Sequence, residues 1–450
     1  MIFTHIFSKI MKVGLTIVLV FLSFASWGSC TLTLVSQTED SYTALIPFGK
    51  INLPSTHLVP PGSHLATVVV PPTNYTHNGA NGSSVLWECA AEDLDKIFFL
   101  VATNGDDRVG GYYDIGAPDG LSDVYATWFA YVGIKQTMAG VALTRFWQKV
   151  PVTSYATTSS GRIQIRLQDI PPIVASLYRI SSLPGTSSAS YYCGNNNTDG
   201  SGIGFGSSTG RLYSCIQPNS YIQLSTSTDG VIPFGHDQPG GDSATKFLFW
   251  GADNGFGYGM RTANMLYAVP SCVARAATPV VMFPPISVSD LEAGMSSTAN
   301  FSVKVECQDN TVSGVANSQT ALGFQVSEGA YSAAQSLGLV NASGGVSTLV
   351  SDDYFADNMA KGVGISISYS DAPDAPITLI APPGVAALTP GGNAAGWYPV
   401  MRGAVSAGAS GAADHSYYDY SFIATLKKLD AVPVTAGKVH ATAYVLVKVQ

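Results

Sequence analysis

The chain has 450 residues, a formal net charge of −8 and charged side chains at only 12% of its positions, against about 25% in an average globular chain. It contains no run of basic residues, which argues against nucleic acid and against an anionic membrane surface as partners. The length predicts two or three domains. Its 46 glycines and 10% aromatic residues suit many short strands joined by tight turns.

The first 28 residues have the pattern of an export signal. Lys9 and Lys12 precede an apolar run over residues 13–25, and small residues follow it. This order is typical of a secretory signal peptide, and we expect cleavage after Gly28. The apolar run is shorter than the ~20 residues that a membrane span needs, so an anchor is the weaker interpretation. A lipoprotein with Cys30 as the modified residue is a further interpretation.

Six cysteines follow the predicted signal. An even number in an exported chain predicts disulfides, and six cysteines allow fifteen connectivities. Pairing in sequence order is the simplest hypothesis. No Cys-x-x-Cys occurs, so a zinc ribbon or a thioredoxin-type site is not expected. The cysteines are Cys30, Cys89, Cys193, Cys215, Cys272 and Cys307.

Strand patterns recur along the chain, whereas helical patterns are nearly absent. Apolar residues alternate with polar ones, and Gly-, Asp- and Asn-rich turns lie between the alternating segments. Short strands with regular turn signals predict β-sandwich domains. The clearest alternating segments are residues 163–167, 301–307, 365–369 and 418–426.

The composition changes near residues 271–279. The preceding part is rich in Tyr, Trp, Asp and Asn, and the following part is rich in Ala, Ser and Val, with Trp397 as its single tryptophan. We therefore predict two domains, over residues 29–271 and 272–450. Each is long enough to bury its own core.

The last eleven residues form the most regular strand pattern. Small and branched apolar residues fall on one face and mostly polar residues on the other, so the segment predicts a half-buried β-strand. This core-type strand ends the sequence, so another element is expected to lie beside it. The apolar face consists of Ala441, Ala443, Val445, Val447 and Val449.

Three motifs in the second part occur in a familiar order. The first is Cys272 with Phe283-Pro-Pro and Phe301-Ser-Val-Lys-Val-Glu-Cys307; the second is Gly362-Val-Gly-Ile-Ser-Ile-Ser368. The third is Val434-Thr-Ala-Gly437 ahead of the last strand. Together they resemble the pilin domain of chaperone–usher fimbriae over roughly residues 272–450. The interval between the two cysteines is longer than in that family, and Val449 stands where the family has Tyr or Phe.

The resemblance implies an all-β chain that ends in an incomplete immunoglobulin-like sandwich lacking its last strand, with a disulfide between Cys272 and Cys307. A periplasmic pilus chaperone, and then the next pilus subunit at the outer-membrane usher, would donate the missing strand. The five apolar residues of the last strand would line the groove that receives it. An open groove and an unpaired strand edge promote aggregation, so residues 272–450 alone are expected to aggregate. A complete sandwich whose last strand reaches the end of the chain is the competing interpretation.

The N-terminal end of the sequence indicates where in a fimbria this subunit would lie. A subunit that donates a strand needs a free alternating arm ahead of its first cysteine, and Cys30 follows the expected cleavage point almost directly. We therefore expect this chain to accept a strand without donating one, at the fimbrial tip on the cell surface. Residues 29–271 then resemble the receptor-binding, lectin-like β-sandwich of the two-domain tip adhesins.

Two segments contain residues that suit carbohydrate binding. Sugars are bound by aromatic faces together with planar carboxylates, amides and guanidinium groups. The first segment offers Asp106, Asp107, Arg108, Tyr112 and Tyr113; its competing interpretation is a solvated turn. The second is a Gly-rich stretch with Trp250, Asp253, Asn254 and Tyr258, which can equally be a plain hairpin near the domain boundary. The polar loop between Cys193 and Cys215 is a further candidate rim.

No metal, cofactor or catalytic site is predicted. His57, His64 and His77 have a spacing that does not place them on one strand face, so we interpret them as surface histidines. Motifs of serine hydrolases, zinc proteases and phosphate-binding loops are missing from the sequence. A glycosidase with two carboxylates would leave no local signature and stays open as an interpretation. We therefore predict a non-enzymatic tip adhesin for a carbohydrate receptor; an adhesin for a protein receptor, with or without metal, and a minor pilin or adaptor are the competing hypotheses.

Overall fold

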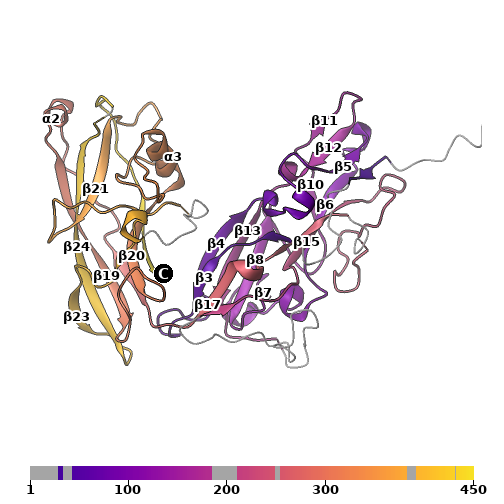
Figure 1. The fold of residues 1–450 in the computed structure, drawn as a ribbon, viewed down its shortest axis with the longest axis horizontal. Coiled ribbons are helices and arrows are strands. Elements are labelled where there is room, and N and C mark those ends of the chain that lie inside the picture. The colour runs from indigo at the N-terminus through magenta and orange to yellow at the C-terminus, as the bar shows by residue number, and fades with distance from the viewer. Residues whose placement is uncertain (1–28, 34–42, 185–209, 249–253, 383–391, 431) are drawn as a thin grey trace, which may run out of the picture.

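The computed structural model describes residues 29–33, 43–184, 210–248, 254–382, 392–430 and 432–450. Almost all regular structure in these residues is β-strand, which confirms the predicted all-β class. The chain forms two lobes that lie side by side (Figure 1). We call residues 29–271 the N-terminal lobe and residues 272–450 the C-terminal lobe, and each lobe has a large buried apolar cluster of its own.

The N-terminal lobe contains four sheets in its described residues. The first has the order β1 (Thr31–Leu32), β5 (Val85–Cys89), β12 (Ile163–Arg166) and β11 (Ala156–Thr157). The second has the order β10 (Gln148–Pro151), β6 (Ile97–Thr103), β15 (Ser220–Thr226), β16 (Phe256–Gly259) and β2 (Thr43–Leu45). The third has the order β4 (His64–Val70), β13 (Ile173–Arg179), β8 (Val132–Met138) and β7 (Tyr125–Ala126), with β9 (Val141–Ala142) on β8. The fourth is β14 (Arg211–Leu212), β17 (Asn264–Tyr267) and β3 (Gly49–Asn52).

The centre of this lobe is the antiparallel pair β6 and β15, in which every residue is buried. Phe99 and Val101 point into the main core, and Phe98 and Leu100 point into a second cluster on the other face. Apolar residues therefore cover both faces of this pair, which is why β6 is a continuous apolar run rather than an alternating one. By contrast, the predicted alternation around residue 165 is found in β12, a strand with one buried face.

The C-terminal lobe contains two sheets in its described residues. One has the order β18 (Cys272–Ala277), β19 (Ser297–Gln308), β24 (His415–Lys428) and β21 (Val363–Tyr369), with β23 (Val405–Ala409) on β24. The other has the order β22 (Tyr398–Pro399), β20 (Thr320–Val326) and β25 (Ala443–Val449). Strands β19, β21, β24 and β25 contain the segments that the alternation of the sequence predicts as strands.

The helices are short. In the C-terminal lobe α2 (Val288–Glu292) and α3 (Glu328–Ser336) each begin after a serine whose hydroxyl accepts a backbone N–H, a common way to start a helix. The sequence showed almost no helical pattern because neither helix is long enough to develop one. A π-turn, η4 (Arg108–Tyr112), follows β6. The remaining turns are the 3-10 segments η1 (Pro72–Asn74), η2 (His77–Gly79), η3 (Ala91–Asp93), η5 (Ala117–Asp119), η6 (Leu167–Asp169), η7 (Arg261–Ala263) and η8 (Gly392–Ala395).

Where the structure describes both partners, each disulfide joins two cysteines that are consecutive in the sequence. Cys30 is bonded to Cys89 and joins β5 to the segment that begins the N-terminal lobe. Cys272 is bonded to Cys307 and joins β18 to β19, as the resemblance implied. Cys215 is also disulfide-bonded, but Cys193, its predicted partner, lies outside the described residues.

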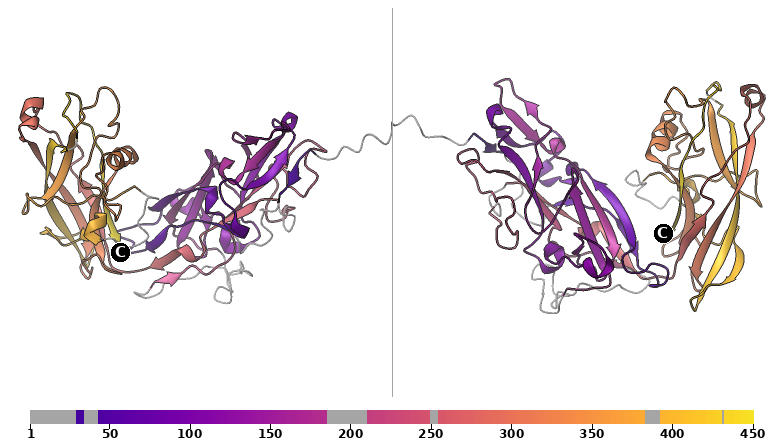
Figure 2. Two further views of the ribbon diagram at one scale, coloured as in Figure 1. Left: turned by 45° about the horizontal axis from the view of Figure 1, so that its top comes forward. Right: turned by 180° about the vertical axis from the view of Figure 1, so that it is seen from behind.

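The two lobes meet at one end, where β3, β17 and the last residues of the chain lie (Figures 1 and 2). Val449 of β25 packs with Tyr267 and Val269 of the N-terminal lobe. Across the same junction Lys50 Nζ donates a hydrogen bond of 2.7 Å to Asn317 Oδ1. Strand β25 therefore takes part in the second sheet of the C-terminal lobe and in the junction. Within the described ranges, no helix has the length and apolar character to cross a membrane.

Candidate functional site

The outer edge of β25 is the first candidate site. β25 pairs antiparallel with β20, from Ala443 opposite Val326 to Val449 opposite Thr320. In the described part of the chain no strand pairs along its other edge. An unpaired edge presents a row of N–H and C=O groups, which is a template for another strand.

The apolar face of β25 is only partly covered. Ala443, Val445 and Val447 pack against the core of the C-terminal lobe and remain half-buried, as does Ala441 ahead of the strand. Val449 differs from these four predicted groove residues because it is buried at the junction between the lobes. Strands in a closed sandwich bury their inward face, so the half-buried series shows that the apolar face of β25 is incompletely covered.

Apolar residues of the segment after β18 show the same partial burial. Val281, Phe283 and Ile286 pack against the same core as β25 and are also half-buried. Between them Met282 is 77% exposed. β18 itself lies close to β25 without pairing with it. We call the partly exposed apolar residues of 281–286 and 441–447 together the edge groove.

β25 is held firmly at both ends although its outer edge is open. Ahead of it, the Asp352 carboxylate accepts hydrogen bonds from Thr442 N (3.1 Å), Thr442 Oγ1 (2.7 Å) and Ser327 Oγ (2.5 Å). At its end Gln450 N donates to Gln319 O over 2.8 Å. These contacts fix the position of the strand.

The first predicted sugar-binding segment divides into buried and accessible residues. Asp107 is buried, and its Oδ1 accepts the N–H groups of Val109 (2.8 Å) and Gly110 (3.0 Å), which caps the π-turn η4. Asp106 is exposed, while Tyr112 and Tyr113 are half-buried with ring centroids 4.8 Å apart. Asp107 therefore supports the turn that presents its neighbours. The side chain of Arg108 lies outside the described residues.

The second predicted segment is described only from Asn254 onward, because Trp250 and Asp253 lie outside the described residues. Asn254 is fully buried, accepts the indole N–H of Trp87 (2.9 Å) and donates to Leu224 O (2.9 Å). Tyr258 is also fully buried, and this burial raises the pKa of its hydroxyl well above the ordinary value. Both side chains support the core and are out of reach of a ligand at the surface.

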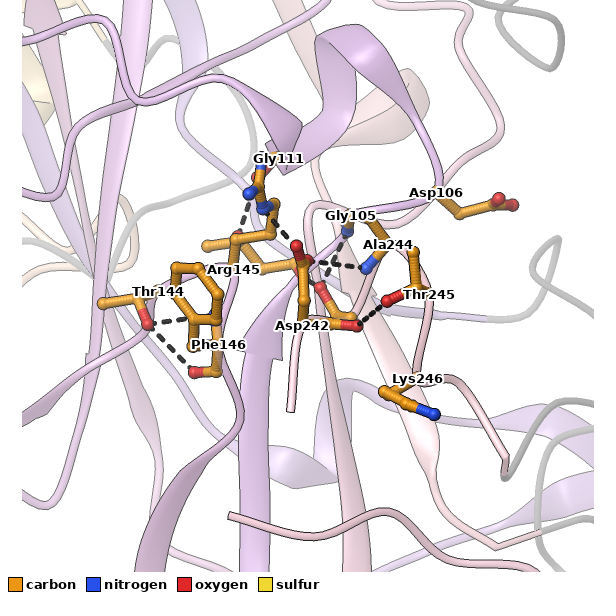
Figure 3. Close-up of polar contacts among 12 residues, drawn as sticks. Gly105, Asp106, Gly111, Thr144, Arg145, Phe146, Asp242, Ala244, Thr245 and Lys246 are labelled. Atoms are coloured by element: carbon orange, nitrogen blue, oxygen red, sulfur yellow. Dashed lines mark hydrogen bonds and ion pairs between the residues drawn. The ribbon is translucent and has the colours of Figure 1, made fainter. Parts of the chain in front are cut away.

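Arg145, Phe146 and Asp242, which the sequence pattern does not single out, lie close together in the N-terminal lobe (Figure 3). The Arg145 guanidinium carbon lies 4.5 Å from the centroid of the Tyr112 ring and 5.4 Å from that of the Phe146 ring. Arg145 Nε lies 3.0 Å from Asp242 Oδ1 as an ion pair, and a quarter of each of these two side chains is exposed. We call Tyr112, Arg145, Phe146 and Asp242 the stacked cluster.

Two loops bring the stacked cluster together. Ser243 N donates to Arg145 O and Trp147 N donates to Gly241 O, so residues 145–147 and 241–243 form a short antiparallel ladder. Gly105 N donates to Ser243 Oγ over 3.1 Å. A Cβ atom at residue 105 would lie 2.4 Å from Ala244 N, so only glycine allows this close approach.

The predicted surface histidines have different environments. His64 is exposed and contacts Thr67 Oγ1, and the His77 ring lies 6.2 Å from that of Tyr75. His57 lies at the junction of the lobes, where its Nε2 is 2.9 Å from Glu306 Oε1. Among the described residues no group of three or more His, Cys, Asp or Glu side chains is arranged to hold a metal ion.

Comparison with known proteins finds a family match for the C-terminal lobe. Residues 262–450 match the family model described as Fimbrial protein. The sequence matches none of the curated proteins with which it was compared. The matched range contains β17 and the whole C-terminal lobe, with β25 and the edge groove.

Several solved structures are similar to the chain at low identity. The CupB6 tip adhesin from Pseudomonas aeruginosa is 11% identical, with 93% of this chain and 94% of that chain covered and a TM-score of 0.22. The chaperone–tip adhesion subunit complex CsuC–CsuE of Acinetobacter baumannii Csu pili is 12% identical, with 93% and 99% covered and a TM-score of 0.22. The P pilus rod subunit PapA is 17% identical, with 41% and 100% covered and a TM-score of 0.23.

TM-scores this low carry no argument of their own. The family match rests on the sequence, and it covers the part of the chain in which three motifs occur in the order of a pilin domain. Over residues 262–450, which are 42% of the chain, the sequence is therefore similar to the fimbrial protein family.

Proposed function

We propose that the chain is a two-domain adhesin of a chaperone–usher fimbria and that its C-terminal lobe accepts a strand donated by the next subunit. The observation that supports this most directly is the open outer edge of β25 above a half-buried apolar face. A donated strand would continue the sheet β22–β20–β25 through backbone hydrogen bonds. Its apolar side chains would fill the edge groove between residues 281–286 and 441–447. This is β-strand addition, a recurring mode of peptide recognition.

The edge groove also explains why the lobe would need a chaperone. Contiguous apolar surface and a free strand edge promote self-association in water. A periplasmic pilus chaperone that lends a strand would cover both until the outer-membrane usher brings the next subunit. The donated strand of that subunit would then take the place of the chaperone strand.

The segment that precedes the C-terminal lobe supports a position at the tip. A pilin that donates a strand needs a free segment ahead of its first strand, β18. Here the preceding segment is β17, which pairs with β14 and β3 in the N-terminal lobe and continues into the junction. Such a segment is built into a folded lobe, so it is not available to a neighbour. The chain then accepts a strand and presents the N-terminal lobe at the end of the fibre.

The N-terminal lobe would carry the receptor-binding function, and a surface glycan is the receptor that we propose. The exposed part of the predicted segment at Asp106 and the stacked cluster supply the aromatic and planar polar groups that sugars require. A binding role without catalysis fits a chain with a fimbrial-type domain. Weak single sites would suffice because many fimbriae act together. A protein receptor and a role as minor pilin are the competing proposals.

The test is self-complementation of the mature chain. A donor strand with alternating apolar residues is fused after Gln450 through a tight two-residue turn, so that it runs antiparallel to β25. We expect the fused chain to be monomeric, to resist proteolysis and to melt well above the unfused chain. A fused donor with charged residues at the inward positions is the matched control. Equal stability and solubility of the unfused chain and both fusions would contradict strand acceptance.

A further inference from the structure

We propose that the stacked cluster is the primary sugar-binding subsite, and that it takes a neutral hexose whose flat C–H face lies on the Phe146 ring. This proposal rests on the proposed function, in which the N-terminal lobe binds the receptor. It names a binding surface formed by three segments of the chain, at residues 112, 145–146 and 242. Three features support it: the exposed ring of Phe146, the guanidinium of Arg145 and the balance of charges around the stacked cluster.

The Phe146 ring is exposed and yet its backbone is fixed. The side chain is 45% exposed, whereas the next residue, Trp147, is buried, because neighbouring residues of an extended segment point to opposite sides. Phe146 N donates to Thr144 Oγ1 (3.2 Å), and Phe146 O accepts hydrogen bonds from Thr144 Oγ1 and Gln148 Nε2 (both 2.9 Å). Three side-chain hydrogen bonds therefore hold an exposed aromatic residue in place. Because the backbone is already fixed, a ligand that covers the ring does not have to order it.

The Arg145 guanidinium is placed beside this ring as a fixed planar donor. The Tyr112 and Phe146 rings flank it, and Asp242 holds its Nε side at 3.0 Å. Asp242 is fixed in turn because its Oδ1 accepts the N–H of Ala244 over 3.0 Å. A planar guanidinium next to a carboxylate matches a pair of neighbouring hydroxyl groups, which both donate and accept hydrogen bonds. An exposed aromatic ring with such a pair at its side is the combination that a pyranose requires.

The charges around the stacked cluster favour a neutral sugar. Arg145 is paired with Asp242, and the exposed Lys246 and Asp106 side chains project from the two adjoining loops (Figure 3). Among the described side chains named here, the two positive groups offset the two negative groups; the side chain of Arg108 lies outside the described residues. A sialic acid or a sulfated sugar needs an uncompensated cation to offset the desolvation of its anion. We therefore assign the subsite to uncharged hexoses.

The experiment is a glycan array with the mature chain carrying the fused donor strand, followed by titration calorimetry with the best neutral ligand. We expect hits among neutral hexose-terminated glycans, with Phe146→Ala weakening binding at least about tenfold and Phe146→Trp retaining it. Phe355→Ala, an exposed phenylalanine of the C-terminal lobe, and Tyr155→Ala, an exposed aromatic residue of the N-terminal lobe, are the matched controls and should bind as the parent chain. Circular dichroism melting verifies that each variant is folded.

The possible outcomes separate the subsite from the proposed function. Parent-like glycan binding by Phe146→Ala would overturn the subsite and leave the glycan-binding adhesin standing. Binding restricted to acidic glycans would overturn the assignment to neutral sugars. The absence of any glycan hit would overturn both the subsite and the glycan receptor, and strand acceptance would still be judged by the self-complementation test. Loss of binding in Phe146→Ala with an unchanged melting temperature, recovered in Phe146→Trp, supports the subsite.

Discussion

His57 of the N-terminal lobe and Glu306 of the C-terminal lobe are joined across the junction by a contact of 2.9 Å between Nε2 and Oε1. The Glu306 side chain is buried, and its Oε2 accepts a hydrogen bond of 2.7 Å from Arg275 Nε. Arg275 in turn donates to the backbone oxygen of His57 over 3.2 Å. One carboxylate therefore ties together the loop of His57 and the strands β18 and β19.

The first prediction concerns this carboxylate and pH. Burial alone would raise the pKa of Glu306, but hydrogen bonds from Ser410, His57 and Arg275 lower it to about 2. A carboxyl group with a depressed folded-state pKa contributes stability above its unfolded value of 4.5, and this contribution is lost as the pH falls from there toward 2. We expect the free energy of unfolding in urea to fall over this interval. Glu306→Gln should remove this pH-dependent part of the free energy of unfolding. At neutral pH it should lower the free energy of unfolding by about 1–3 kcal/mol. An unchanged pH profile in the variant would contradict this role of Glu306.

The second prediction compares the two faces of β25. Val445 is half-buried in the edge groove, whereas Tyr444 is 54% exposed on the opposite face. Val445→Lys should place a charge where donor side chains pack, and it should abolish the stabilisation by a fused donor strand. Tyr444→Lys should leave that stabilisation nearly intact. Thermal melting of both variants with the fused donor measures the difference, and equal effects of the two substitutions would argue against the edge groove as the acceptor.

The third prediction separates two neighbouring carboxylates. Asp107 is buried and accepts two backbone N–H groups of η4, whereas Asp106 is exposed. Asp107→Ala should cost about 1–3 kcal/mol because it leaves buried donors unsatisfied. Asp106→Ala should change the free energy of unfolding by less than about 0.5 kcal/mol. Urea unfolding of both variants measures the contrast, and similar losses would show that Asp107 does not support the turn.

The fourth prediction concerns the contact between the two loops of the N-terminal lobe. Gly105→Ala brings a Cβ to 2.4 Å from Ala244 N, so the segment at residues 242–246 must move and the stacked cluster is disturbed. We expect a loss of about 1–3 kcal/mol in stability and weaker glycan binding. Gly411→Ala is the control, because its added Cβ meets nothing within 4 Å. A Gly105→Ala variant that unfolds and binds like the parent would contradict the close packing of these loops.

Periodicity explains which strands could be predicted from the sequence. A strand with one buried face alternates visibly, so the pattern predicts β12, β19, β24 and β25. The Cys272–Cys307 bond followed from the resemblance and is present. The short helices α2 and α3 gave no pattern because they make few turns.

The candidate binding residues were harder to predict. Asn254 and Tyr258 occur in a Gly-rich segment that suggests a ligand loop, yet the fold uses the amide to satisfy backbone groups and the ring to fill the core. Phe146 and Asp242 carry no local signal, since their proximity depends on the ladder between residues 145–147 and 241–243. Tyr112 was identified because aromatic and charged residues gather around it in the sequence.

Amide hydrogen exchange along β25 tests the central claim most directly. The N–H groups that face the outer edge of residues 443–449 are unpaired by any described strand. We predict that these amides exchange rapidly in the chain without a donor and become protected by at least about a hundredfold when the fused donor strand is present. Amides of β6, which is buried between two neighbours, should be protected in both forms. Outer-edge amides of β25 that are already protected without a donor, or that stay unprotected with it, would contradict strand acceptance.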